Sequence, residues 1–168
     1  MLALLVAGTA ALGASPVPPE PVARAWAWAA GGEYLGRDSV RLQEGAWDCG
    51  VAALAMVLDA HHRPADLEPV AREVEERQRG LTLLEMQGIA TRRGVNATGW
   101  RLDLAGLRRA ALPAIAHFDD HYVVVDRVAA DGAVHFRDPA LGQMVIPGER
   151  FTRLWTGHVL VFPAVPPR

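Results

Sequence analysis

The sequence contains one cysteine in 168 residues, and this scarcity excludes several kinds of site. A lone thiol cannot form a disulfide within the chain, and it cannot supply the several cysteine ligands of a structural zinc site. Free cysteines are usually buried as small hydrophobes, so composition alone favours that role for Cys49 over a reactive one. The residues around Cys49 must decide between the two.

An excess of charge of either sign is also missing. Lysine and arginine number 17 against 19 for aspartate and glutamate, which gives a formal net charge of −2. The sequence has neither the basic stripe of a nucleic-acid-binding protein nor the acidic block of a charged tail. We therefore expect no nucleic-acid partner, and no motif implies a metal or organic cofactor.

The sequence has no apolar run of the length that a transmembrane helix requires, about 20 residues. The first 12 residues, MLALLVAGTAAL, are nevertheless apolar, and small residues and a Pro-rich stretch follow them over 13–21. This order is typical of a signal peptide and a spacer, although the basic n-region is missing. We expect an exported protein, periplasmic or secreted. The alternative is an unprocessed apolar tail or a short interfacial anchor.

The rest of the sequence is typical of one globular domain, with 51% hydrophobic and 21% charged residues. We expect a signal peptide and spacer over 1–21, an approach segment over 22–40 and the domain over 41–163. In the approach segment, Trp26 and Trp28 could pack on a core or begin a strand. The same segment contains Ala30-Gly31-Gly32, which we interpret as a flexible turn rather than a self-processing site.

Helical patterns come first in the expected domain. Residues 49–62 are almost continuously apolar and rich in Ala, Leu and Met, which favours a buried helix with Asp48 as its N-cap. An amphipathic helix is expected over 66–77. A third helix should begin at the capping-box pattern Thr82-Leu-Leu-Glu85 and end at Gly94.

Strand patterns follow the helices. We expect strands over 95–102, 113–118, 122–128, 134–137, 144–146 and 158–162, with short helices over 104–111 and 150–154. Asp131-Gly132 is a hairpin signal. Helices followed by antiparallel strands indicate an α+β fold, with the N-terminal helices packed on an antiparallel sheet.

Cys49 lies where the first long helix of the domain is expected to begin. The N-terminus of a helix has free N–H groups and a partial positive charge, which favour a thiolate, and a histidine beside it would complete the activation. Gln43 lies six residues earlier, in the loop that enters the helix. Its amide and the backbone N–H of Cys49 could hold an oxyanion, although the spacing alone favours a surface glutamine.

The base must be chosen among six histidines. His61 and His62 should end the first helix of the domain, where a cation complements the helix dipole, so we interpret them as structural. His135 and His158 lie in expected strands. His117 remains a neighbour of the better candidate, His121.

His121 stands at the start of the strand 122–125, where a side chain can project into a cleft. Taken alone, such a histidine is more often a surface residue. Asp138 ends the next strand and would lie beside His121 in an antiparallel pair, where a carboxylate could fix the imidazole tautomer. The alternative for Asp138 is a turn-forming role before Pro139.

Three motifs occur in order: Gln43 followed by Asp48-Cys49-Gly50-Val-Ala-Ala-Leu-Ala-Met56, then His121-Tyr-Val-Val-Val125, then Asp138-Pro139-Ala-Leu-Gly142. Together they resemble the C39 family, the papain-like, double-glycine (bacteriocin-processing) cysteine peptidases, over about 41–162. The resemblance implies a papain-like fold and a peptide or protein substrate. It also implies Cys49 as nucleophile, His121 as general base, Asp138 as orienting acid and Gln43 as oxyanion-hole donor.

Many members of that family are the leading domain of an ABC exporter. This sequence ends at Arg168 with no membrane spans and no phosphate-binding Gly-Lys loop, so it resembles a stand-alone form. We expect a cysteine endopeptidase that hydrolyses peptide bonds through a Cys-His-Asp triad, with cleavage after Gly-Gly as the finer expectation. The alternatives are a catalytically idle C39-like domain that binds peptides, and transfer of the acyl group to an amine. The sequence does not predict the oligomeric state.

Overall fold

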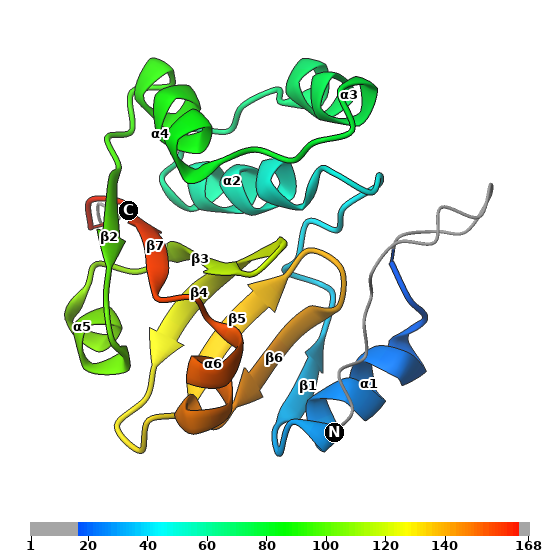
Figure 1. The fold of residues 1–168 in the computed structure, drawn as a ribbon, viewed down its shortest axis with the longest axis vertical. Helices are drawn as coiled ribbons and strands as arrows, with labels where there is room; N and C mark the ends of the chain where they lie inside the picture. Colours follow the sequence, from blue (N-terminus) through cyan, green and yellow to red (C-terminus); the bar gives the residue numbers. More distant parts are fainter. Residues whose placement is uncertain (1–16, 165–168) are drawn as a thin grey trace.

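A computed structural model describes residues 17–164, and these form one antiparallel sheet with helices on both faces (Figure 1). The strand order is β1-β6-β5-β4-β3-β7-β2. The helices are α1 (Glu20–Ala29), α2 (Cys49–Ala60), α3 (Glu68–Glu76), α4 (Leu83–Arg92), α5 (Leu104–Arg109) and α6 (Gly148–Leu154). The strands are β1 (Glu33–Gly36), β2 (Thr98–Arg101), β3 (Ala114–Phe118), β4 (His121–Val128), β5 (Val134–Asp138), β6 (Gly142–Ile146) and β7 (His158–Val161). The expected α+β order and antiparallel pairing are confirmed.

On one face of the sheet, α2 is the central helix of the core. Residues from Cys49 to Leu58 are all buried, because α2 lies between the sheet and the segment that contains α3 and α4. This position explains why its sequence is apolar on every side rather than on one stripe. Tyr122 and Val124 of β4 point toward α2, while Val123 and Val125 point to the opposite face, as alternation along a strand requires.

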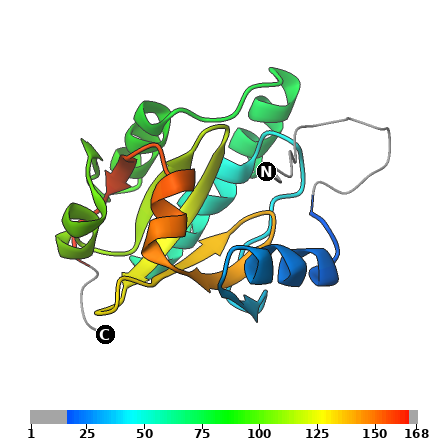
Figure 2. The same cartoon turned by 60° about the horizontal axis from the view of Figure 1, so that its bottom comes forward.

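The opposite face packs against α1, α5 and α6 (Figure 2). Aromatic rings of Phe118, Phe136 and Phe151 meet edge to face there, with centroids 5.1 to 6.1 Å apart. Such pairs add about 0.5–1.5 kcal/mol each beyond the burial of their area. The sheet that carries the candidate site is therefore fixed from both sides.

The approach segment folds as part of this structure. It forms α1, which buries Ala23, Ala27 and Ala30, and β1, which pairs with β6. A strand at Trp26–Trp28 is therefore wrong: both residues lie on α1, and Trp28 is 81% exposed. The expected signal peptide and most of the spacer lie outside the described residues, and α1 already begins at Glu20, within that spacer.

Gly31 and Gly32 form the turn between α1 and β1. Gly31 has a φ of +75°, and a Cβ on Gly32 would overlap the carbonyl oxygen of Val145. Both positions therefore require glycine for the fold itself, which supports their interpretation as a turn.

The capping box that opens α4 is confirmed. Thr82 Oγ1 accepts the N–H of Glu85 at 3.2 Å, and the Glu85 carboxylate accepts the N–H of Thr82 at 2.7 Å. Hydrogen bonding to Arg79, followed by that to Thr82, lowers the pKa of Glu85 to about 2. The pair satisfies two of the donors that a helix N-terminus leaves free.

His61 differs from its expected role as a cation at the end of α2. Its side chain is buried, and desolvation, followed by the charge of His62, lowers its pKa. The ring lies 6.0 Å from that of Phe162, as a neutral packed group. Separately, none of the helices within residues 17–164 combines the length and the apolar character needed to span a bilayer.

Candidate active site

Three sequence-distant residues meet where α2 packs on the sheet. Cys49 is the first residue of α2, His121 the first of β4 and Asp138 the last of β5. Because β4 and β5 are antiparallel neighbours, the first residue of β4 and the last residue of β5 lie side by side, at the same end of the two strands. α2 packs against β4, which brings Cys49 to His121. The expected proximity of His121 and Asp138 is thus a property of strand order.

The imidazole of His121 lies between the other two side chains. Its Nε2 is 2.8 Å from Oδ1 of Asp138. Cys49 lies near enough to the ring to be among the groups that raise its pKa. Since Nε2 faces the carboxylate, Nδ1 is the nitrogen left for the sulfur. The bond to the carboxylate fixes the orientation of the imidazole, which is what a general base requires.

Asp138 is held by its own turn. Its Oδ1 also accepts the backbone N–H groups of Ala140 at 2.7 Å and Leu141 at 3.2 Å, and the residue is 4% exposed. Three donors therefore converge on one oxygen. The Asp-Pro turn that we considered as an alternative role is present, and it is the device that fixes the carboxylate facing His121.

The charge state of His121 follows from these neighbours. Burial acts to lower its pKa, but the charge and hydrogen bond of Asp138, and then those of Cys49, raise the pKa well above its ordinary value. The ring is therefore protonated at neutral pH.

Solvent reaches the side chain of His121 more than that of Cys49. The side chain of His121 is 28% exposed, whereas Cys49 is 7% exposed. Cys49 is buried and belongs to the core cluster around α2, so His121 is the more exposed of the two.

Tyr122 forms a wall of the site that sequence reasoning missed. A Cβ on Gly50 would lie 3.3 Å from Cδ2 of Tyr122, so the residue after Cys49 can be little larger than glycine. Burial, then the negative charge of Cys49, raises the pKa of Tyr122 to about 12. The ring also lies 5.0 Å from that of His117. Its position directly after His121 was the only available signal.

Gln43 is buried, not a surface residue, and lies in the loop of residues 43–48 that leads into α2, here called the entry loop. Its backbone N–H donates to the carbonyl of Pro139 at 2.9 Å, which links the loop to the turn after Asp138. Its Nε2 donates to the carbonyl of Gly45 at 2.9 Å. Nε2 carries a second N–H, for which no acceptor is present among the described residues.

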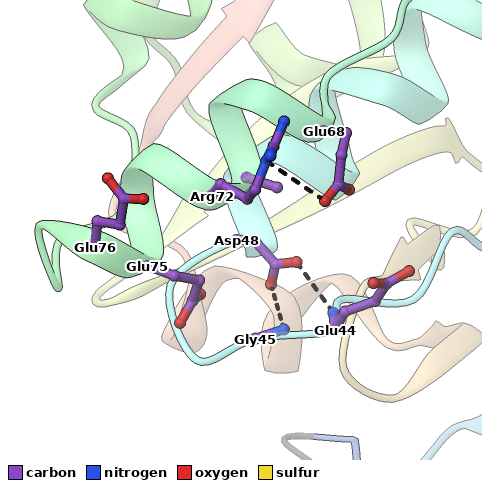
Figure 3. A pocket seen from close by; sticks show the side chains of 8 residues that line it. Glu44, Gly45, Asp48, Glu68, Arg72, Glu75 and Glu76 are labelled. Carbon is purple, nitrogen blue, oxygen red and sulfur yellow. Dashed lines mark hydrogen bonds and ion pairs between the residues drawn. The ribbon is translucent and has the colours of Figure 1, made fainter.

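Asp48 is the N-cap residue of α2 by position, as expected, but its side chain makes no capping bond. Instead its two carboxylate oxygens accept the N–H groups of Glu44 at 3.0 Å and Gly45 at 3.2 Å (Figure 3). Desolvation raises the pKa of Asp48, opposed by these two hydrogen bonds. The carboxylate therefore shapes the entry loop rather than the helix end.

The residues described here, 17–164, contain no cluster of His, Cys, Asp or Glu arranged to hold a metal ion. Of the six histidines, all of which are described, only His121 is placed against both Cys49 and a carboxylate. The groups available for chemistry at the site are thus a free thiol, an imidazole bonded to a carboxylate, and nearby N–H donors.

Comparisons with known proteins give a consistent result. The sequence model of the Peptidase C39 family matches residues 37–165. A double glycine motif protease from an AMS/PCAT transporter, solved in complex with its leader peptide, is 32% identical, has a TM-score of 0.66, and aligns over 78% of this chain and 96% of its own. This similarity confirms the papain-like fold.

Two curated relatives extend the comparison. An uncharacterized protein of Methanothermobacter marburgensis is 35% identical over 132 residues, which is 76% of this chain and 90% of that protein. The probable functional amyloid protease FapD of Pseudomonas aeruginosa is 30% identical over 129 residues, 70% of this chain and 57% of its own length.

Proposed function

The chain belongs to the peptidase C39 family and is a peptidase, and from this premise we propose that it is a cysteine endopeptidase with Cys49, His121 and Asp138 as its catalytic triad. The observation that carries the proposal is the imidazole of His121 held between the thiol and the carboxylate. None of the residues that the chemistry needs is missing, which argues against an idle peptide-binding domain.

In the proposed mechanism, the Cys49 thiolate attacks the carbonyl carbon of the scissile peptide bond. The resulting oxyanion accepts hydrogen bonds from the backbone N–H of Cys49, at the free end of α2, and from the amide of Gln43. His121 donates its Nδ1 proton to the leaving amine, which departs and leaves a thioester on Cys49. The same imidazole then removes a proton from water, which attacks the thioester and releases the acid.

We further propose cleavage after Gly-Gly in leader peptides. The solved relative described as a double glycine motif protease, in complex with a leader peptide, supports this substrate class. The physical reason would be a passage so close to the protein backbone that only residues without a Cβ can enter it. Export of the protein also remains a proposal from its apolar N-terminus, and fractionation of cells that express the full chain would test it.

The proposed activity is tested by incubating the protein with a panel of peptides, some containing Gly-Gly followed by a scissile bond. Mass spectrometry of the products gives the bond cleaved, and added amines reveal any acyl transfer. Cys49→Ser and His121→Ala are the controls, and both should be inactive while folded. Cleavage that survives in Cys49→Ser would contradict the proposed mechanism.

A further inference from the structure

Hydrogen bonds within the entry loop, and one from its first residue to Pro139, hold the loop in shape. Asp48 accepts the N–H groups of Glu44 and Gly45, so the loop folds back on its own end. Gln43 is tied through its backbone to Pro139, beyond the triad carboxylate. These bonds define the shape of the loop, but none of them attaches the middle of the loop, around Trp47, to another element.

The helix α3 provides that attachment. Glu75 Oε1 accepts the N–H of Trp47 at 2.6 Å, across 28 residues of sequence. Figure 3 shows the Glu75 side chain reaching from α3 toward Gly45 of the loop. A Cβ on Gly45 would overlap the carboxyl carbon and Oε1 of Glu75, so any larger residue there would displace the carboxylate. Glu75 therefore contacts the loop at two successive points.

These contacts continue to the proposed oxyanion donor. The carbonyl of Gly45 is the acceptor for Nε2 of Gln43, at 2.9 Å. The direction of that carbonyl sets the plane of the Gln43 amide, and hence the direction of its second N–H. Glu75 packs on the residue that provides the carbonyl, and it holds the residue two positions before Cys49.

Beside these contacts the loop borders an open cavity of about 270 Å³. Its lining includes Glu44, Gly45 and Asp48 from the loop and its helix junction, and Glu68, Arg72, Glu75 and Glu76 from α3 (Figure 3). Across this space, the carboxylate of Glu75 provides the hydrogen bond from α3 to the loop, at Trp47. Oxyanion donors are effective only when they are held in place before the reaction.

We propose that Glu75 is a positioning residue for catalysis: by holding Trp47 N–H and packing against Gly45, its carboxylate keeps the Gln43 amide directed at the oxyanion. The inference rests on the proposed peptidase function. It extends that function to a side chain on α3 that does not contact the triad.

The test begins with Glu75→Ala, Glu75→Gln and the matched control Glu76→Ala. Glu76 lines the same cavity, and no hydrogen bond joins its side chain to the described part of the chain. Glu75→Ala should lower kcat about tenfold with little change in KM, a part of the roughly 100- to 1,000-fold loss expected when a whole oxyanion donor is removed. Glu75→Gln retains an oxygen acceptor for Trp47 and should recover most of the rate, and Glu76→Ala should match the wild type.

A second readout separates positioning from damage to the fold or the triad. Alkylation of Cys49 by iodoacetamide requires the thiolate but no oxyanion hole, so its rate should be unchanged in Glu75→Ala. A parallel loss of alkylation and cleavage would mean that the substitution disturbs the triad, and it would overturn the inference.

A double-mutant cycle then tests the contact itself. In the wild type, Gly45→Ala must displace the Glu75 carboxyl group and should lower kcat to a similar extent. In the Glu75→Ala background the nearest obstacles to that methyl group are gone, so the double variant should be no slower than Glu75→Ala alone. If Glu75→Ala proves unstable, Gly45→Ala alone must still lower kcat with KM preserved.

Wild-type kcat in Glu75→Ala, or additive losses in the cycle, would overturn the inference and leave the peptidase proposal intact. A wild-type protein that cleaves no peptide would instead remove the proposed function, and this inference with it.

Discussion

Replacing Asp138 distinguishes the orienting role of its carboxylate from the effect of its charge. Oδ1 of Asp138 receives three hydrogen bonds, from His121, Ala140 and Leu141. Asp138→Ala leaves all three donors without their acceptor in a buried site. Removing one partner of a buried ionic pair costs about 3–5 kcal/mol of stability, a large part of the 5–15 kcal/mol typical of a domain. In a serine peptidase, replacing the orienting aspartate by asparagine lowers kcat about 10⁴-fold, because the imidazole is then held in the wrong tautomer.

Asp138→Asn should behave differently because of the turn. The two backbone N–H groups of Ala140 and Leu141 select the amide oxygen, not the NH₂ group, for the position that faces His121. The imidazole keeps an acceptor at Nε2 and hence its tautomer. Asp138→Asn then loses mainly the negative charge that strengthens the hydrogen bond to His121. This loss is worth about 1.5 kcal/mol, or roughly tenfold in rate.

The assay is kcat/KM for a fluorogenic peptide as a function of pH, with thermal unfolding as a control for the fold. The raised pKa of His121 places the alkaline fall of activity well above the ordinary titration of histidine. Removing the charge of Asp138 lowers that pKa, so Asp138→Asn should lose activity at a lower pH than the wild type. If Asp138→Asn is as inactive as Asp138→Ala at every pH, the argument from the turn is refuted.

Three further predictions concern the entry loop and the helix α4. Gln43→Ala should lower kcat roughly 100- to 1,000-fold with KM nearly unchanged, and a kcat close to that of the wild type would remove Gln43 from the oxyanion site. Thr82→Ala should lower the free energy of unfolding by about 1 kcal/mol without affecting kcat. Since the pKa of Glu85 is lowered to about 2, its contribution to stability is present above its ordinary value of 4.5 and is lost as the pH falls toward 2. Denaturant unfolding of wild type and Glu85→Gln across that range checks this, and a constant difference between them would be inconsistent with it.

Local patterns in the sequence predicted the parts of the fold that local interactions determine. The continuous apolar run gave α2 with Cys49 at its first residue, and the Thr82–Glu85 box gave the start of α4. The proximity of His121 and Asp138 was also predictable, because adjacent antiparallel strands bring the start of one to the end of the next.

The N-terminal segment shows why one feature can mislead. Trp26 and Trp28 could pack on a core or begin a strand; they lie on α1, where Trp26 packs against the core. The informative positions were the small residues Ala23, Ala27 and Ala30, which recur at helical spacing and are the ones buried. The large size of the tryptophans was not informative, since Trp28 is mostly exposed.

The details of the entry loop were beyond sequence reasoning because they depend on tertiary contacts. Spacing could not show that Gln43 is buried, or that the Asp48 carboxylate turns back to Glu44 and Gly45 instead of capping α2. Glu75 looked like one of several carboxylates on an amphipathic helix. Only the folded chain brings it to Trp47.

Trapping the covalent intermediate tests the central claim most directly. The wild-type protein is mixed with a Gly-Gly peptide, quenched in acid, and Cys49 is analysed by mass spectrometry beside Cys49→Ala. Cys49 should carry the N-terminal fragment of the peptide as a thioester, and the variant should neither cleave nor become labelled. Cleavage by Cys49→Ala at the wild-type rate would contradict that claim.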